Sequence, residues 1–392
     1  MTTSHGLPEG VSQQQLSNAT VLTAGRVITG LELFQPGWVA WSDGQVLAAG
    51  HGTPPRAADL QFPDSIVAPG FVDTHVHGAV SFEFGANQEN NLAIRAAHLA
   101  AGTTSQVASL VSVPKDVLDR QIRSLAEQVA DGHFIGIHLE GPWLSVEHHG
   151  AQASDMFRIP TREDVQSVLD AGAGRIASIT IAPELEGGLE AVRRIVDSGA
   201  VASVGHTHAS YAETHGALAA GARGATHLFN AMRGVHHREP GPVVALLEHD
   251  QAFVELIADG NHLHPATVEG ATRGHARPVL ISDALAAALY GDGDFRLGEL
   301  DVVAKDGRAT VRGTDTLAGS LLSLAQAVKF TVGVAGVPLL QAVQAASINP
   351  ADEMGCTDIG RLTPGARADL VLLDSTLDVT RVLHGGSWVE AE

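Results

Sequence analysis

The chain has little of three things on which many proteins depend: cysteine, positive charge and long apolar runs. Its one cysteine, Cys356, excludes an internal disulfide. No apolar run reaches the roughly 18 residues that a membrane-spanning helix needs, and residues 1–18 are polar, without the apolar core of a signal peptide. We therefore expect a protein of the reducing cytoplasm that has no membrane partner.

Basic residues are scarce, because 24 Lys and Arg stand against 44 Asp and Glu and give a net charge of −20. A surface of this charge repels nucleic acid and anionic lipid, so neither is expected as a partner. An anionic substrate would need a local cluster of cations inside a pocket. The abundant residue is histidine, with 20 copies, and histidine is both the commonest metal ligand and a frequent acid or base.

The two ends of the chain differ in pattern from its middle. Residues 20–28 and 38–49 read as short strands with Asp43-Gly44 as a hairpin turn, and residues 360–389 repeat this style. We expect the segments 19–68 and 352–392 to pair into one small β-sandwich domain, preceded by a polar tail over residues 1–18.

Residues 69–351 alternate short apolar runs with segments of helical period, such as 92–101 and 212–221, which indicates an α/β fold with a parallel sheet. Each candidate strand ends on a polar, chemically capable residue: His77, Glu140, His206, His227, Asp259 and Asp283. In a (β/α)₈ TIM-like barrel the carboxyl ends of all strands face one side, so these residues would converge. The pattern therefore predicts a barrel enzyme.

Four of these side chains, together with His75, suit a metal. His75 and His77 are two residues apart, so on a strand they point to the same face. Taken singly, each histidine is more simply a polar strand end or a hydrogen-bonded core residue, and a glutamate is more simply a cap. Together the five supply nitrogen and oxygen donors for zinc or another divalent transition metal; they are His75, His77, Glu140, His206 and His227.

Asp283 would complete the chemistry. A carboxylate beside such ligands can accept a proton from the attacking water and return it to the leaving group, as general acid–base catalysis requires. The alternative is an aspartate that caps the next helix.

Eight segments carry a resemblance to a known family. The chain resembles the N-acetylglucosamine-6-phosphate deacetylases of the amidohydrolase superfamily over nearly its whole length after the first twenty residues. The His-x-His pair alone would point only to the superfamily, but the Leu-Glu-Gly-Pro-Trp, Thr-His-Leu-Phe-Asn-Ala-Met and Arg-Glu-Pro-Gly strings are more specific. The matching segments are residues 69–78, 138–143, 205–209, 226–232, 238–241, 257–262, 282–283 and 316–320.

The resemblance implies hydrolysis of the N-acetyl group of N-acetylglucosamine 6-phosphate, giving glucosamine 6-phosphate and acetate, in amino-sugar catabolism and cell-wall recycling. It implies two divalent ions, zinc foremost with iron, cobalt or manganese as alternatives. Glu140, His206 and His227 would hold the main ion, His75 and His77 the second, with Glu140 bridging, and Asp283 would be the catalytic acid and base.

The resemblance also implies a substrate-binding set. The sugar phosphate would bind Arg238 and His262, helped by the backbone near Asn230 and Ala231, with Arg238 reaching across from a neighbouring subunit of a homodimer. Gln152 stands where some members have a histidine that polarises the substrate carbonyl. The amide of a glutamine can donate a hydrogen bond to that carbonyl but cannot carry a positive charge. His208 also stands where a smaller polar residue is expected.

Three alternative functions agree less well with the sequence. A different amidohydrolase activity, on cyclic amides or nucleobases, leaves the phosphate-binding residues unexplained, and no lysine is an obvious bridging ligand. An inactive barrel that serves as a binding subunit predicts a lost ligand, and none is missing. A metal-storage role predicts clustered histidines, whereas these are dispersed.

Overall fold

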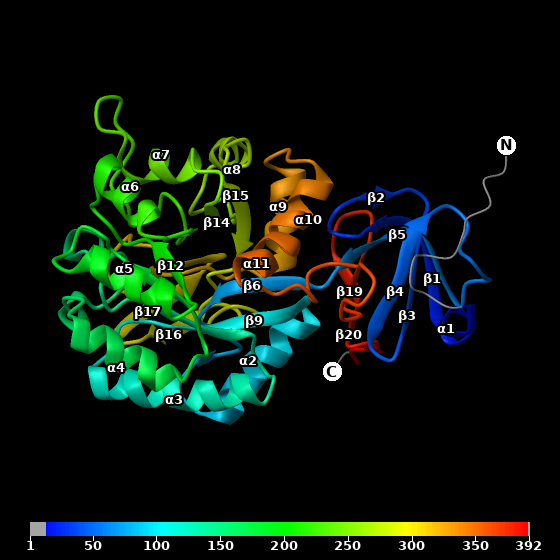
Figure 1. Ribbon diagram of the computed structural model, residues 1–392, viewed down its shortest axis with the longest axis horizontal. Helices are drawn as coiled ribbons and strands as arrows, with labels where there is room; N and C mark the ends of the chain where they lie inside the picture. The colour runs from blue at the N-terminus through cyan, green and yellow to red at the C-terminus, as the bar shows by residue number, and fades with distance from the viewer. Residues whose placement is uncertain (1–12, 391–392) are drawn as a thin grey trace.

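The computed structural model describes residues 13–390. It has two parts, a barrel and a smaller β domain, which lie side by side along the long axis (Figure 1). Within the described residues, no helix combines the length and apolar character needed to cross a bilayer.

The barrel confirms the predicted fold class. Its strands follow one another in chain order and pair in parallel; they are β6 (Phe71–Val76), β9 (Thr103–Leu110), β10 (Gly136–Glu140), β11 (Ile176–Ile181), β12 (Val201–Val204), β13 (Gly224–Ala225), β14 (Phe253–Ile257) and β15 (Arg277–Ile281). The strands are buried along almost their whole length, as expected where helices cover a parallel sheet.

Helices connect the strands and pack outside them. They are α2 (Gln88–Ala100), α3 (Lys115–Ala130), α4 (Arg162–Gly172), α5 (Gly188–Asp197), α6 (Tyr211–Ala219), α7 (Gly241–Leu247), α8 (Pro265–Ala271), α9 (Leu324–Gly333), α10 (Leu339–Ala345) and α11 (Ile348–Glu353), with short 3₁₀ turns η1 (Val146–His148) and η2 (Ser154–Met156). The helices expected over 92–101 and 212–221 are thus confirmed as α2 and α6. Two barrel strands, β9 and β11, do not end on a polar residue, so the pattern of polar strand ends did not identify them.

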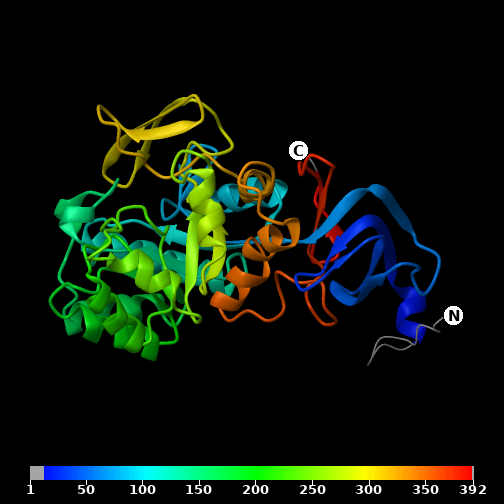
Figure 2. The ribbon, with the colours of Figure 1, turned by 90° about the horizontal axis from the view of Figure 1, so that it is seen from above.

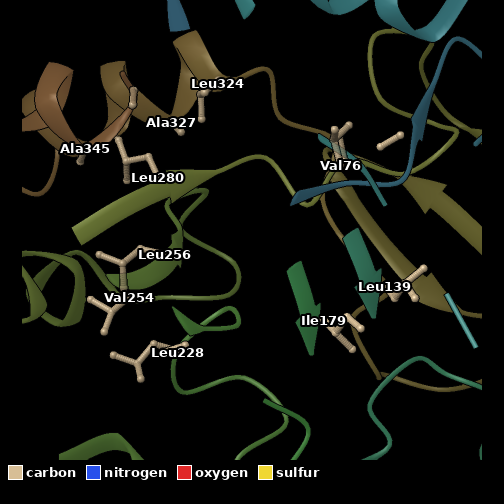
Figure 3. Close-up of a cluster of buried hydrophobic side chains, with 14 of the residues drawn as sticks. Val76, Leu139, Ile179, Leu228, Val254, Leu256, Leu280, Leu324, Ala327 and Ala345 are labelled. Atoms are coloured by element: carbon tan, nitrogen blue, oxygen red, sulfur yellow. The ribbon is translucent and has the colours of Figure 1, made fainter. Parts of the chain in front are cut away.

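Aliphatic side chains from strands and helices fill the space between them. Leu280 on β15 packs in the same cluster as Leu324 and Ala327 on α9, and all three are fully buried (Figure 3). Each buried leucine contributes about 1.5–3 kcal/mol of favourable transfer free energy. The barrel wall is therefore a rigid support for the residues that extend beyond it.

The two chain ends share one sheet, as predicted. Its path is β21-β20-β19-β5-β1-β3-β4, with β2 paired to β1. The N-terminal and C-terminal segments meet where β5 and β19 pair antiparallel. The strands are β1 (Thr20–Ile28), β2 (Leu33–Phe34), β3 (Gly37–Ser42), β4 (Gln45–His51), β5 (Leu60–Pro69), β19 (Leu370–Leu373), β20 (Val379–His384) and β21 (Ser387–Trp388).

Local signals account for the small domain. Asp43 and Gly44 both have positive φ, 51° and 75°, in the predicted hairpin turn between β3 and β4. Only Gly70 separates β5 from barrel strand β6, and a Cβ there would lie 2.2 Å from Thr104 Oγ1.

Of the predicted tail, residues 1–12 lie outside the described residues, and α1 (Gln13–Asn18) forms the rest.

The barrel closes at its carboxyl end. Its first and last strands, β6 and β15, form no ladder with each other in the described chain. Instead the Asp283 backbone N–H donates to the His75 carbonyl at 2.9 Å, and the His77 N–H donates to the Ala284 carbonyl at 2.8 Å. The seam therefore runs through residues predicted to do the chemistry.

Two further small sheets follow barrel strands. The pair β7 (Gly78–Ala79) and β8 (Phe82–Glu83) follows β6, and an antiparallel sheet of β16 (Gly293–Leu297), β17 (Leu300–Lys305) and β18 (Arg308–Val311) follows β15. The latter, which the sequence did not predict, forms a separate layer beside the barrel in Figure 2. It supplies one wall of the pocket described below.

His98 gives a test of the packing between α2 and the turn after β6. Its ring is fully buried, with Nε2 at 3.1 Å from the Gly78 carbonyl, and burial lowers its pKa to about 4. In the unfolded chain a histidine has a pKa of about 6.5, so that state takes up a proton as pH falls below this value while the folded state does not. Stability is therefore lost as pH falls from about 6.5 toward 4.

We predict that between pH 7.5 and 5.5 the wild-type protein loses about 1 kcal/mol more of its unfolding free energy than His98→Gln, which keeps a donor for Gly78 but cannot titrate. Urea unfolding at the two pH values measures the difference. An identical loss in both proteins would show that His98 is not held neutral.

Candidate active site

Six side chains converge at the carboxyl end of the barrel, where the strand-end pattern predicts them. They form two groups whose donor atoms lie close enough to share one ion each. We name these the Glu140 triad (Glu140, His206 and His227) and the Asp283 triad (His75, His77 and Asp283). All six residues are at least nine-tenths buried.

In the Glu140 triad, one carboxylate oxygen faces two imidazoles. Glu140 Oε1 lies 3.0 Å from His206 Nε2 and 2.8 Å from His227 Nε2, and the two nitrogens are 3.1 Å apart. Among the described residues, the Nδ1 atom of His227 has no hydrogen-bond partner. The polar contacts of that ring are thus on its Nε2 side.

In the Asp283 triad, His75 Nε2 and His77 Nε2 are 3.0 Å apart, and each lies within 3.4 Å of Asp283 Oδ1. The second oxygen of Glu140, Oε2, lies 3.3 Å from His77 Nε2. Glu140 therefore stands between the two triads, with one oxygen toward each.

The backbone turns sharply to aim three of these side chains. His206, His227 and Asp283 follow directly or within two residues of β12, β13 and β15, and all have positive φ, of 47°, 28° and 47°. Such left-handed conformations cost non-glycine residues on the order of 1–3 kcal/mol each. The packed barrel beneath holds them in place.

Two histidines have their outer ring nitrogen fixed by an acceptor. His75 Nδ1 lies 3.0 Å from Glu255 Oε2, and His206 Nδ1 lies 2.8 Å from the His148 carbonyl. Because a carbonyl only accepts, and a carboxylate accepts, each Nδ1 carries a proton and each Nε2 faces the pocket. This arrangement orients histidines for metal binding.

The two carboxylates stay ionised despite burial. Burial alone would raise the pKa of Glu140, but hydrogen bonds from the surrounding imidazoles hold that pKa well below its ordinary value. Burial would also raise the pKa of Asp283, but the nearby His75 and His77 outweigh it and lower that pKa below its ordinary value. Two negative charges thus sit where little water can solvate them.

These charges draw positive charge into the pocket. Burial would lower the pKa of His75 and of His77, but the nearby carboxylates outweigh it and raise the pKa to about 9 for His75 and about 10 for His77. A divalent cation satisfies the same demand, and the nitrogen and oxygen donors fit zinc or a similar transition metal. Protons and metal ions compete for these sites.

A pocket of about 340 Å³ opens over the two triads. Its walls include most of the predicted site residues, with additions from the β16–β18 layer. Of the predicted residues it is lined by His77, Glu140, Gln152, His206, His227, Asn230, Ala231, His262 and Asp283. His75 lies beneath this surface, fully buried.

Two of the predicted binding residues have defined partners. His262 Nδ1 lies 2.7 Å from Asp259 Oδ2, which leaves Nε2 for a ligand. The amide of Gln152 is partly engaged, because its oxygen accepts from the Ser112 N–H at 3.0 Å and its nitrogen donates to the Glu140 carbonyl at 3.2 Å. One amide N–H of Gln152 remains for a substrate oxygen.

Arg238 is not part of this chain's own pocket. It lies on an exposed segment, with Nη1 2.7 Å from His237 Nε2. The adjacent Glu239 pairs with Arg233 rather than with Arg238. Within a single chain, the pocket lining instead includes Arg308, from the β16–β18 layer.

Sequence reasoning missed two residues here, Glu255 and Arg308. Glu255 lies inside β14 rather than at its end, so the strand-end pattern passes over it. Arg308 follows Asp306-Gly307 in an ordinary hairpin turn, and no motif marks it.

The sequence matches the amidohydrolase family over residues 66–389. It is similar to the N-acetylglucosamine-6-phosphate deacetylase of Vibrio furnissii, 34% identical over 329 residues, which are 82% of this chain and 81% of that protein. It is also similar to the N-acetylgalactosamine-6-phosphate deacetylase of Escherichia coli O157:H7, 33% identical over 83% of this chain and 87% of that protein.

A solved structure is similar to this chain over nearly its whole length. The N-acetyl-D-glucosamine-6-phosphate deacetylase of Mycobacterium smegmatis, solved in complex with N-acetyl-D-glucosamine 6-phosphate, has a TM-score of 0.92 and 45% identity to this chain. The match covers 95% of this chain and all of that one.

Glu255 provides a test of the metal-binding geometry. We predict that Glu255→Gln, which removes the charge that holds the His75 proton, weakens metal binding at the Asp283 triad by about 10–100-fold. Metal content after dialysis against a graded chelator measures this.

Glu353→Gln is the matched control. Glu353 is buried in the same region, and burial together with the charge of Glu255 raises its pKa well above the ordinary range. The raised pKa favours the neutral carboxyl group, and an amide of similar shape should leave metal content unchanged. Equal retention by the Glu255 variant and the wild type would contradict the positioning role.

Proposed function

Because the chain belongs to the amidohydrolase family, and within it to the N-acetylglucosamine-6-phosphate deacetylases, we propose that it removes the acetyl group of N-acetylglucosamine 6-phosphate. The products are glucosamine 6-phosphate and acetate, and the role is in amino-sugar catabolism and cell-wall recycling in the cytoplasm. The observation that carries the proposal is the pair of triads beneath a pocket that also holds His262 and Arg308.

The proposal includes two divalent ions, with zinc as the metal, one at each triad and with Glu140 between them. Bound metal supplies a lowered pKa for the attacking water and polarisation of the amide carbonyl. The donor atoms are those already placed by the fold, and the orientation of His75 and His206 needs no rearrangement.

Asp283 acts as the acid and base. Its carboxylate lines the pocket, and its backbone N–H is held by the His75 carbonyl. The low pKa of Asp283 means that it enters the reaction ionised, ready to accept the proton of water. It then returns that proton to the amine nitrogen as the C–N bond breaks, and acetate leaves.

The phosphate binds at the other side of the pocket. His262, held at Nδ1 by Asp259, and the backbone near Asn230 and Ala231 supply donors. Arg308 is the only Lys or Arg that lines the pocket among residues 13–390, and it supplies the local positive charge that an anionic substrate needs in a protein of net charge −20.

Arg238 completes this set from a neighbouring subunit in the proposed homodimer. It lies outside its own pocket on an exposed segment, where the side chain of Val235 is 57% exposed although apolar. A second copy that covers this segment would bury Val235 and bring Arg238 to the other pocket.

The main experiment is acetate release from metal-loaded protein. We predict rapid release from N-acetylglucosamine 6-phosphate, slow release from unphosphorylated N-acetylglucosamine, and a loss of about 10²–10⁴-fold in kcat for Asp283→Asn, which cannot accept a proton. N-acetylgalactosamine 6-phosphate belongs in the same assay, because a relative named for that substrate is nearly as similar. No release from either phosphorylated sugar would overturn the proposal.

Arg308 gives a finer test. We predict that Arg308→Gln lowers kcat/KM for the phosphorylated sugar by about tenfold through a higher KM, since a hydrogen bond between charged groups contributes about 1.5–3 kcal/mol before solvent exposure weakens it. The rate with the unphosphorylated sugar should not change.

Lys305→Gln is the control for Arg308. Lys305 is paired with Arg308 in the register of the same hairpin and is also exposed, but it does not line the pocket. If both variants behave alike, the effect is general electrostatics and Arg308 is not a phosphate contact.

A further inference from the structure

A third group of metal-binding side chains lies at the rim of the pocket, outside both triads. Glu147 and His148 are on the short turn η1, and His208 follows β12. His148 Nε2 lies 2.9 Å from His208 Nδ1, which in turn lies 3.3 Å from Glu147 Oε1. We propose that these three residues form an additional site for a divalent transition metal, which we call the rim site.

The spacing of the donor atoms supports one shared ion. Bond lengths of about 2.0–2.1 Å in a tetrahedral zinc site place ligand atoms roughly 3.3 Å apart. The rim-site distances of 2.9 and 3.3 Å fall within the range of 2.8–3.4 Å found inside the two buried triads. The two ring planes are inclined by 24°, with centroids 5.1 Å apart, and the two nitrogens face each other at 2.9 Å, so one ion beside the line between them could bind both.

The backbone holds these side chains through contacts that leave the donor atoms available. The His208 N–H donates to Glu184 Oε1 at 2.6 Å. The His148 N–H donates to the Ser145 carbonyl at 3.0 Å, and the His148 carbonyl accepts from His206. The backbones of His148 and His208 are therefore held in place, which lowers the entropic cost of bringing their two rings to one ion.

Exposure distinguishes the rim site from the pocket. The His208 side chain is 42% exposed and that of Glu147 is 67% exposed, so an ion can enter directly from solvent and keep water ligands. The site should therefore bind after the buried triads fill and release its ion more readily.

An ion in the rim site would connect two segments of the pocket wall. Residues 150–152 line the pocket directly after η1, and His208 is two residues beyond His206. The bound ion would join these segments and restrain the wall that carries Gln152.

The test is a metal titration of protein whose buried triads are already filled, with Cu²⁺ or Co²⁺ followed by calorimetry and by its absorption spectrum. We expect about one further equivalent to bind, with a spectrum of nitrogen ligation. His208→Asn should weaken this step at least tenfold, since even residues that only orient ligands change affinity by about 10–100-fold. Glu147→Gln, at an exposed position that folding does not require, should weaken it as well.

His215→Asn is the matched control. His215 also pairs with a glutamate on the surface, with Nε2 3.0 Å from Glu248 Oε1, but within the described part of the chain these two belong to no group of three possible metal ligands. This variant should bind the further equivalent like wild type. If no further equivalent binds, or if the His208 and Glu147 variants bind it as tightly as wild type, the close nitrogens are a hydrogen bond and the proposal is wrong. Because the readout is binding, its outcome is independent of the deacetylase assay.

Discussion

The proposed active site depends on one buried negative charge, the carboxylate of Glu140. It is only 5% exposed, and an isolated charge in such a place is very unfavourable unless cations or hydrogen bonds surround it. One of its oxygens faces His206 and His227, and the other faces His77. Because Asp283 adds a second buried carboxylate, the pocket requires more positive charge than the rest of this acidic protein supplies. Divalent ions would neutralise these carboxylates, and the carboxylates would then serve as metal ligands.

The barrel imposes this arrangement. Strand β10 ends on Glu140, and the seam between β6 and β15 closes with hydrogen bonds from Asp283 and His77 themselves. The bonds that complete the barrel therefore also fix the distances within the Asp283 triad. Behind the ligands, Glu255 and the His148 carbonyl hold the protons of His75 and His206. Closure of the barrel and the geometry of the proposed catalytic site therefore depend on the same few residues.

Much of this arrangement could be predicted from sequence, because the proposed ligands stand at strand ends and strand ends converge in a barrel. The terminal segments were also predictable, since turns such as Asp43-Gly44 are local. The rest depends on tertiary packing. Strands β9 and β11 end without a polar residue, Glu255 acts from within a strand, and Arg308 reaches the pocket only because the β16–β18 layer folds toward it. The position of the Gln152 amide, which bonds to the Ser112 N–H and the Glu140 carbonyl, likewise depends on how a loop packs.

The central claim is that Glu140 stands between two metal ions, one in each triad. Anomalous diffraction from crystals of the metal-loaded protein, recorded on both sides of the metal absorption edge, tests it most directly. The account predicts two peaks within the pocket, one among Glu140, His206 and His227 and one among His75, His77 and Asp283. A single peak, or a second peak away from the His75 and His77 ring nitrogens, would contradict it.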